Sequence, residues 1–127
     1  MDENEISKAI VDSAFRLHTK LGPGLFEHVY EQILEFELVK RGLAVKHQEP
    51  IPLVYDEIKL DAAFKADLLV NDKVIVELKS VTKLADIHKK QLLTYLKISN
   101  LRLGLLINFN ETLIKDGIVR IANGMPR

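Results

Sequence analysis

The sequence contains no cysteine and no tryptophan among its 127 residues. The absence of cysteine excludes a disulfide framework, a cysteine nucleophile, a thiolate zinc site and an iron–sulfur cluster. No apolar run reaches the ~20 residues that a membrane-spanning helix needs, and the acidic start Met1–Glu5 lacks the basic and apolar regions of a signal peptide. We therefore expect a cytoplasmic protein that does not act at a membrane.

An excess of charge of one sign is also missing, because eighteen basic and eighteen acidic side chains give a formal net charge of zero. This is not the strongly basic profile that indicates a nucleic-acid-binding protein. Locally the charge is uneven, since the segment Lys79–Lys97 holds five lysines against the single acid Asp86. These lysines can contact a phosphate backbone, and they can equally form the solvated face of a helix.

The order of helical and strand-like patterns predicts the fold class. We expect helices over 3–20, 25–41 and 86–98, and strands over 44–47, 51–55, 64–70, 73–80, 102–108 and 118–121. The turn signal Asp116–Gly117 should fold residues 113–115 back against 118–121 as a hairpin. Because helices and strands interleave without a linker or repeat, the prediction is one α/β domain over residues 1–127, a mixed central sheet flanked by helices.

Two acids and a lysine, Asp67, Glu77 and Lys79, interrupt otherwise apolar strand-like runs. Side chains alternate between the faces of a strand, so each run has an apolar face for a core and a face that carries the charges. A two-residue turn at Asn71–Asp72 would send the acids to opposite faces, whereas a loop of odd length centred on Asp72 would set Asp67 across from Glu77. We predict the odd loop.

Carboxylates that face each other on neighbouring strands, with Cβ atoms roughly 4.5–5.5 Å apart, can share one divalent cation. Oxygen ligands suit magnesium or manganese, and a lysine beside them stabilises charge or orients a nucleophile, which together suit phosphodiester hydrolysis. These residues alone also fit a plainer alternative, in which Glu77 and Lys79 are an exposed ion pair and Asp67 ends a strand. Asp61 is the next acid to consider should Asp67 be misplaced.

A resemblance to a known family rests on two motifs. Asp67 and Glu77-Leu78-Lys79 resemble the signature of the PD-(D/E)xK nuclease superfamily, with Ala66 where the proline would stand. The stretch Gly24-Leu-Phe-Glu-His-Val-Tyr30 resembles the GxxExxY motif of the small GxxExxY proteins, which are grouped with those nucleases. The likeness covers residues 10–123, approximately.

The resemblance implies a restriction-endonuclease-like core and a metal-dependent nuclease. In this interpretation Asp67, Glu77 and Glu27 are metal ligands for Mg²⁺ or Mn²⁺, Lys79 acts at the nucleophile or the scissile phosphate, and the partner is nucleic acid, with DNA expected first. An acid such as Glu27 in the first turn of a helix is also favoured by the helix dipole alone.

The predicted third helix carries another likeness, since Gln91-Leu-Leu-Thr-Tyr95 is similar to the QxxxY motif of RecB-type nucleases. Glutamine and tyrosine offer neutral hydrogen bonds to phosphate, water or the lysine, so Gln91 is a candidate supporting catalytic residue. The alternative is a polar helix stripe with a half-buried tyrosine. The candidate nucleic-acid contacts are Tyr30, Lys83, Lys89, Lys90 and Tyr95.

Two other functions remain open for the same fold. One is a non-catalytic relative that binds nucleic acid or regulates, and the other is a protein–protein adaptor whose surface is the first helix. Only catalysis requires the three carboxylates and Lys79 to converge. A nuclease of this size would gain reach and specificity as a dimer, so we also expect a homodimer.

Overall fold

The computed structural model describes residues 1–125, so the last two residues of the predicted domain lie outside it. In chain order the elements are α1 (Glu3–Leu21), α2 (Glu27–Lys40), β1 (Val45–Tyr55), β2 (Ile58–Val70), β3 (Val74–Lys79), α3 (Asp86–Ser99), β4 (Leu103–Asn108), the 3₁₀ helix η1 (Ile114–Gly117) and β5 (Ile118–Ala122). The five strands form a sheet in the order β1-β2-β3-β4-β5. β3 and β4 are parallel and the other neighbours are antiparallel, so the predicted α/β class with a mixed sheet is confirmed.

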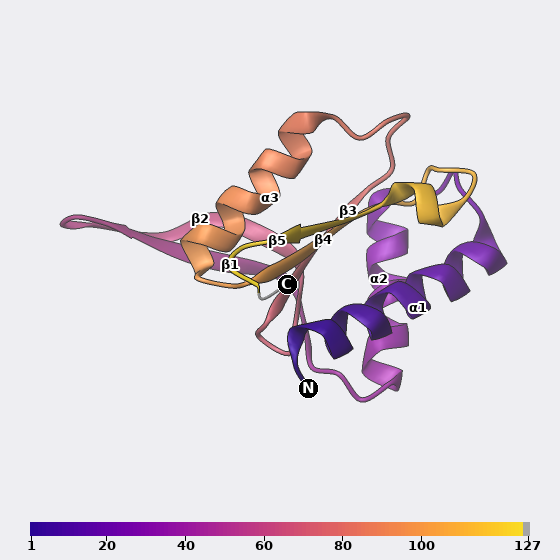
Figure 1. Cartoon of the computed structure of the whole chain (residues 1–127), viewed down its shortest axis with the longest axis horizontal. Helices are drawn as coiled ribbons and strands as arrows, with labels where there is room; N and C mark the ends of the chain where they lie inside the picture. The colour runs from indigo at the N-terminus through magenta and orange to yellow at the C-terminus, as the bar shows by residue number, and fades with distance from the viewer. Residues whose placement is uncertain (126–127) are drawn as a thin grey trace.

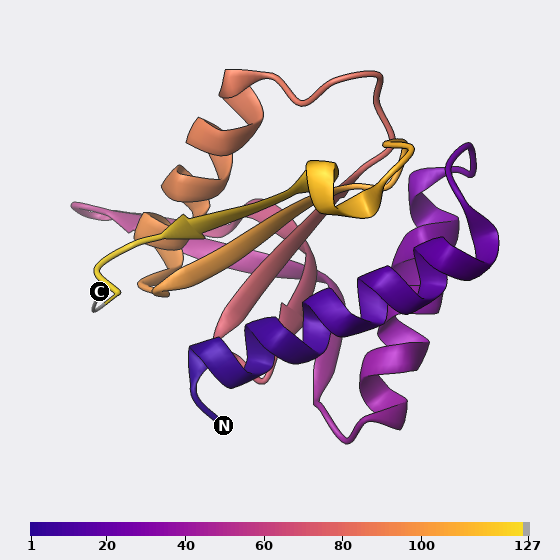
Figure 2. The ribbon, with the colours of Figure 1, turned by 45° about the vertical axis from the view of Figure 1, so that its right-hand side comes forward.

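The helices form a layer on each face of the sheet, with α1 and α2 on one side and α3 on the other (Figures 1 and 2). Because side chains alternate between the two faces of a strand, β2 and β3 contribute to both hydrophobic clusters. Leu68 and Val76 belong to the cluster under α1 and α2, and Leu69 and Ile75 belong to the cluster under α3. Every residue of β4 is buried, as expected for a strand covered on both faces. Within residues 1–125, no helix is both long enough and apolar enough to cross a membrane.

One glycine fixes how closely α3 packs on this sheet. A Cβ atom added to Gly104 on β4 would lie 2.9 Å from Leu92 Cδ1 of α3, closer than ordinary van der Waals contact. The absence of a side chain at this position therefore allows α3 to pack closely on β4.

β1 and β2 form a long hairpin that projects from the sheet (Figure 1). β2 pairs with β3 only over Leu68–Val70, so the rest of β2 has β1 as its partner. The segment from Pro52 to Ala63, which we call the β1–β2 arm, is mostly exposed.

The sequence prediction of two short strands before residue 56 is wrong, because β1 runs without a break from Val45 to Tyr55. Gln48 takes a positive φ of 51°, and Pro50 and Pro52 are tolerated because β1 is the edge strand of the sheet.

The predicted hairpin at Asp116–Gly117 is also wrong. Residues 114–117 form η1, and β5 pairs with β4, with Ile118 opposite Ile107. The glycine serves a different purpose, because a Cβ atom at Gly117 would collide with the backbone oxygen of Asn108. It allows η1 to pass close to the end of β4.

Candidate metal and nuclease site

The loop between β2 and β3 decides whether the two acids meet. Val70 pairs with Val74, so the loop has three residues and is centred on Asp72. Its first two residues have φ angles of 52° and 54°, a conformation that Asn and Asp tolerate better than most residues. The odd loop predicted from the sequence is confirmed, and it sets Asp67 and Glu77 one step beyond the last paired residues.

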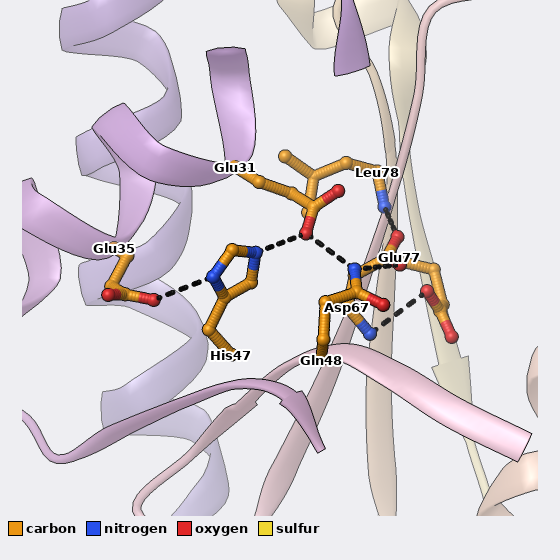
Figure 3. A network of polar contacts seen from close by, with 7 residues as sticks. All are labelled: Glu31, Glu35, His47, Gln48, Asp67, Glu77 and Leu78. Carbon is orange, nitrogen blue, oxygen red and sulfur yellow. Dashed lines mark hydrogen bonds and ion pairs between the residues drawn. The ribbon is translucent and has the colours of Figure 1, made fainter. Parts of the chain in front are cut away.

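The two carboxylates lie where β2 separates from β3, a place we call the β2–β3 fork (Asp67, Glu77 and Leu78). Glu77 Oε2 accepts a hydrogen bond from the backbone N–H of Asp67 at 3.4 Å, and Asp67 Oδ2 accepts one from the backbone N–H of Leu78 at 2.9 Å. Figure 3 shows both contacts. Each carboxylate is thus held by the backbone of the opposite strand.

The fork perturbs the ionisation of Glu77, which is 8% exposed. Burial, a hydrogen bond with the Asp67 side chain and the negative charge of Asp67 together raise the pKa of Glu77 to about 10. The bond from the backbone N–H of Asp67 and, less strongly, the Lys79 ammonium oppose this shift. Glu77 is therefore protonated at neutral pH. Two adjacent carboxylates ionise together only when a cation balances them.

The structure places a further carboxylate beside the fork, that of Glu31 on α2. Gln48 Nε2 donates to Glu31 Oε1 at 2.7 Å and to Asp67 Oδ1 at 3.2 Å, so it bridges the two acids (Figure 3). His47 Nε2 lies 2.8 Å from the same Glu31 oxygen, and its Nδ1 lies 3.6 Å from Glu35. Glu31 is buried and fixed by neighbours from β1.

Glu27, the acid that the sequence placed at the site, lies on the surface at the first residue of α2. No hydrogen bond connects it to Asp67 or Glu77 among the residues that the structure describes. Glu31 comes one helical turn later, where α2 lies against the sheet. The four-residue spacing between the two acids was a signal that could have identified Glu31, whereas Gln48 depends on a local backbone distortion that the sequence does not announce.

Tyr30 lies in the core, so the prediction that it contacts nucleic acid is wrong. Its side chain is fully buried and its ring stacks on Phe109, with centroids 4.5 Å apart. The hydroxyl donates to Gly22 O at 2.6 Å and accepts from the N–H of Leu25 at 3.1 Å. Tyr30 therefore holds the loop before α2.

On the other face of the sheet, Tyr95 of α3 is half-buried and stacks on Phe64, with ring centroids 3.8 Å apart. Burial, and then the charges of Glu77 and Asp67, raise the pKa of Tyr95. Gln91 is exposed on the same helix. The remaining predicted contacts are exposed as well: Lys83, Lys89 and Lys90.

The donor set suits a hard divalent cation, because the groups at the fork are carboxylate oxygens. No group of three His, Asp or Glu side chains in residues 1–125 is already arranged to hold a metal ion. Glu31 is hydrogen-bonded by His47 and Gln48, and Glu77 is protonated. Glu31, Asp67 and Glu77 could therefore bind a cation together only after Glu77 loses its proton and side chains shift. The residues thus fit a metal in the chemistry of their donor atoms, while their present arrangement would have to change to hold one.

Comparison with known proteins agrees with this geometry. The family model of the PD-(D/E)XK nuclease superfamily matches residues 4–121, a segment that includes α1, the β2–β3 fork and most of β5. No curated protein and no solved structure matches the chain. Since the family model covers almost the whole chain, the protein belongs to the PD-(D/E)XK nuclease superfamily.

Proposed function

We propose that the protein is a metal-dependent nuclease that hydrolyses phosphodiester bonds of nucleic acid, with DNA as the expected substrate. The supporting observation is the β2–β3 fork, where Asp67 and Glu77 are fixed side by side and Lys79 is near enough to act on the pKa of Glu77. Membership of the nuclease superfamily supports this class of reaction.

In this proposal Asp67 and Glu77 would hold Mg²⁺ or Mn²⁺. Glu31, instead of Glu27, would be the third carboxylate ligand. Such an ion, when bound, polarises the phosphate and lowers the pKa of a water molecule. Lys79 stabilises the negative charge that develops on the phosphate. Gln91 stays a prediction as a supporting hydrogen-bond donor.

We also propose contacts to the phosphate backbone from three exposed lysines, Lys83, Lys89 and Lys90. The narrower likeness to GxxExxY proteins, the cytoplasmic location and the homodimer also stay predictions. Light scattering at micromolar concentration tests the dimer directly.

The experiment is cleavage of single-stranded, duplex and branched DNA and RNA in Mg²⁺ or Mn²⁺. Wild type is compared with Glu77→Gln, which keeps the size of the side chain, and with the control Glu3→Gln at the half-exposed first residue of α1. We expect cleavage by wild type and by the control and none by Glu77→Gln. Equal cleavage by all three would mean a contaminating nuclease, and no cleavage by any would favour the non-catalytic nucleic-acid-binding or adaptor alternative.

A further inference from the structure

Two aromatic rings lie on the surface at the beginning of α2. Phe26 is 76% exposed, and its ring stacks on the imidazole of His28 with centroids 5.7 Å apart and planes 13° apart. A single exposed apolar side chain is common and needs no explanation. This one differs because it forms an ordered stack and because of where the stack lies.

Two observations place the stack at the edge of the cluster formed by Glu31, Asp67 and Glu77. Ser80 Oγ donates to the backbone oxygen of Leu25 at 2.9 Å, which ties the residue before Phe26 to the residue after Lys79. His28 and Glu31 are three residues apart on α2 and are therefore neighbours on its surface. Figure 1 accordingly draws the beginning of α2 beside the end of β3.

The backbone that presents Phe26 is held on both sides. The N–H of Leu25 donates to the hydroxyl of Tyr30, and that hydroxyl donates to Gly22 O. Together with the contact from Ser80, these bonds fix both backbone polar groups of Leu25, the residue before Phe26. A rigid aromatic side chain on a fixed backbone loses little entropy when a ligand stacks on it.

From this placement we propose that Phe26 and His28 form a stacking platform for a nucleobase of the substrate strand, next to the phosphate that is cut. In a duplex the faces of each base are covered by its neighbours, so a ring can stack only on an unpaired or extruded base. The inference thus rests on the proposed nuclease function and adds its substrate class, nucleic acid with unpaired nucleotides at the cleavage point.

The charge of the chain supports this source of affinity. With a formal net charge of zero, the protein has no general attraction to a polyanion. Stacking is a short-range contact that every base can make, and it complements the local phosphate contacts expected from the lysines near the site.

The test measures binding of the full chain to a single-stranded oligonucleotide that contains 2-aminopurine, in EDTA so that no cleavage occurs. Phe26→Ala should bind about tenfold more weakly and lose the fluorescence quenching of the base, while Phe26→Trp should retain both. The matched control is Phe36→Ala, because Phe36 is 56% exposed on the same helix but ten residues farther along it. It should bind like wild type.

Equal affinity and quenching in wild type and Phe26→Ala would overturn the platform, as would tighter binding of wild type to the matching duplex or no binding at all. The nuclease function and the stacking platform can be contradicted independently of each other. Binding with quenching but no cleavage in any metal would support the platform and contradict the nuclease, whereas cleavage of single strands with an unchanged KM in Phe26→Ala would do the reverse.

Discussion

The two halves of β2 have opposite environments although they belong to one strand. The inner half, from Phe64 to Val70, is largely buried between the helix layers, whereas the outer half, from Ile58 to Ala63, is exposed on the β1–β2 arm. Leu68 in the inner half is 0% exposed and Leu60 in the outer half is 47% exposed. The apolar character of a strand therefore does not by itself predict burial.

The boundary between the halves explains the position of the candidate site. Beyond Leu68 the pairing of β2 with β3 stops, so the N–H groups of Asp67 and Leu78 no longer have a strand partner across the gap. Side-chain carboxylates take those donors instead. The site thus arises where a sheet ceases to be continuous, because buried backbone donors must find other acceptors.

The largest expected effect contrasts the acids of the two halves. Asp67→Asn should lower metal-dependent cleavage at least about 100-fold, since it removes a negative ligand of the proposed cation, while Asp61→Asn on the arm should leave the rate unchanged. Initial rates at saturating Mn²⁺ measure both. A large loss with Asp61→Asn would move the site onto the arm and contradict the assignment.

A contrast in stability comes next. Leu68→Ala should lower the free energy of unfolding by about 2–5 kcal/mol because it leaves a cavity in the core under α1 and α2, whereas Leu60→Ala should cost less than about 1 kcal/mol. Urea denaturation provides the measurement. Equal losses at the two positions would show that a partner covers the arm in solution.

The ionisation of Glu77 makes the metal-free protein sensitive to pH. Its pKa is about 10 in the folded protein against 4.5 for an ordinary glutamate side chain, so the folded state binds more protons between those values. Its contribution to stability is present below pH 4.5 and is lost as the pH rises toward 10, at up to about 1.4 kcal/mol per pH unit.

Glu77→Gln should therefore unfold at a higher urea concentration than wild type at pH 9, and saturating Mn²⁺ should remove the difference in pH dependence. Glu3→Gln, at the half-exposed first residue of α1, is the control. A wild-type stability that stays flat from pH 6 to 9 without metal would show that the carboxyl group is not protonated in the fold.

The smallest effect concerns the bridge between the carboxylates. Gln48→Ala should cost about 0.5–1 kcal/mol of stability in metal-free protein, because Glu31 and Asp67 lose the donor that lies between them. The exposed Gln32→Ala on α2 should have no effect, and thermal unfolding distinguishes the two. A Gln48→Ala variant as stable as wild type would show that the bridge is not required.

Local chemistry explains what the sequence could predict. The three helices lie within two residues of their expected ends because their apolar periodicity is strong. The register that aligns Asp67 with Glu77 depends on a three-residue loop whose Asn and Asp favour positive φ. Both features are determined by residues close to one another in the chain.

Long-range packing decided the rest. Glu31 and Gln48 meet only because β1 is distorted at Gln48 and passes beside α2. Of the arm, the outer half of β2 from Ile58 to Ala63 was not expected as strand, and its residues are exposed without an alternating buried face. The wrong hairpin prediction at Gly117 also comes from long-range packing, because the glycine is required by the close approach of Asn108 at the end of β4.

The parallel pairing of β3 with β4 has a consequence for the order of folding. The β1–β2 hairpin closes through the two-residue turn Asp56–Glu57 and can form within about 1–10 μs, whereas the parallel pair must wait for the crossover through α3. Glu77 lies opposite Leu106 of β4, so this neighbour reaches Glu77 only at that late step. During synthesis, the three acids Glu31, Asp67 and Glu77 all leave the ribosome before β4, the strand that completes the parallel pair.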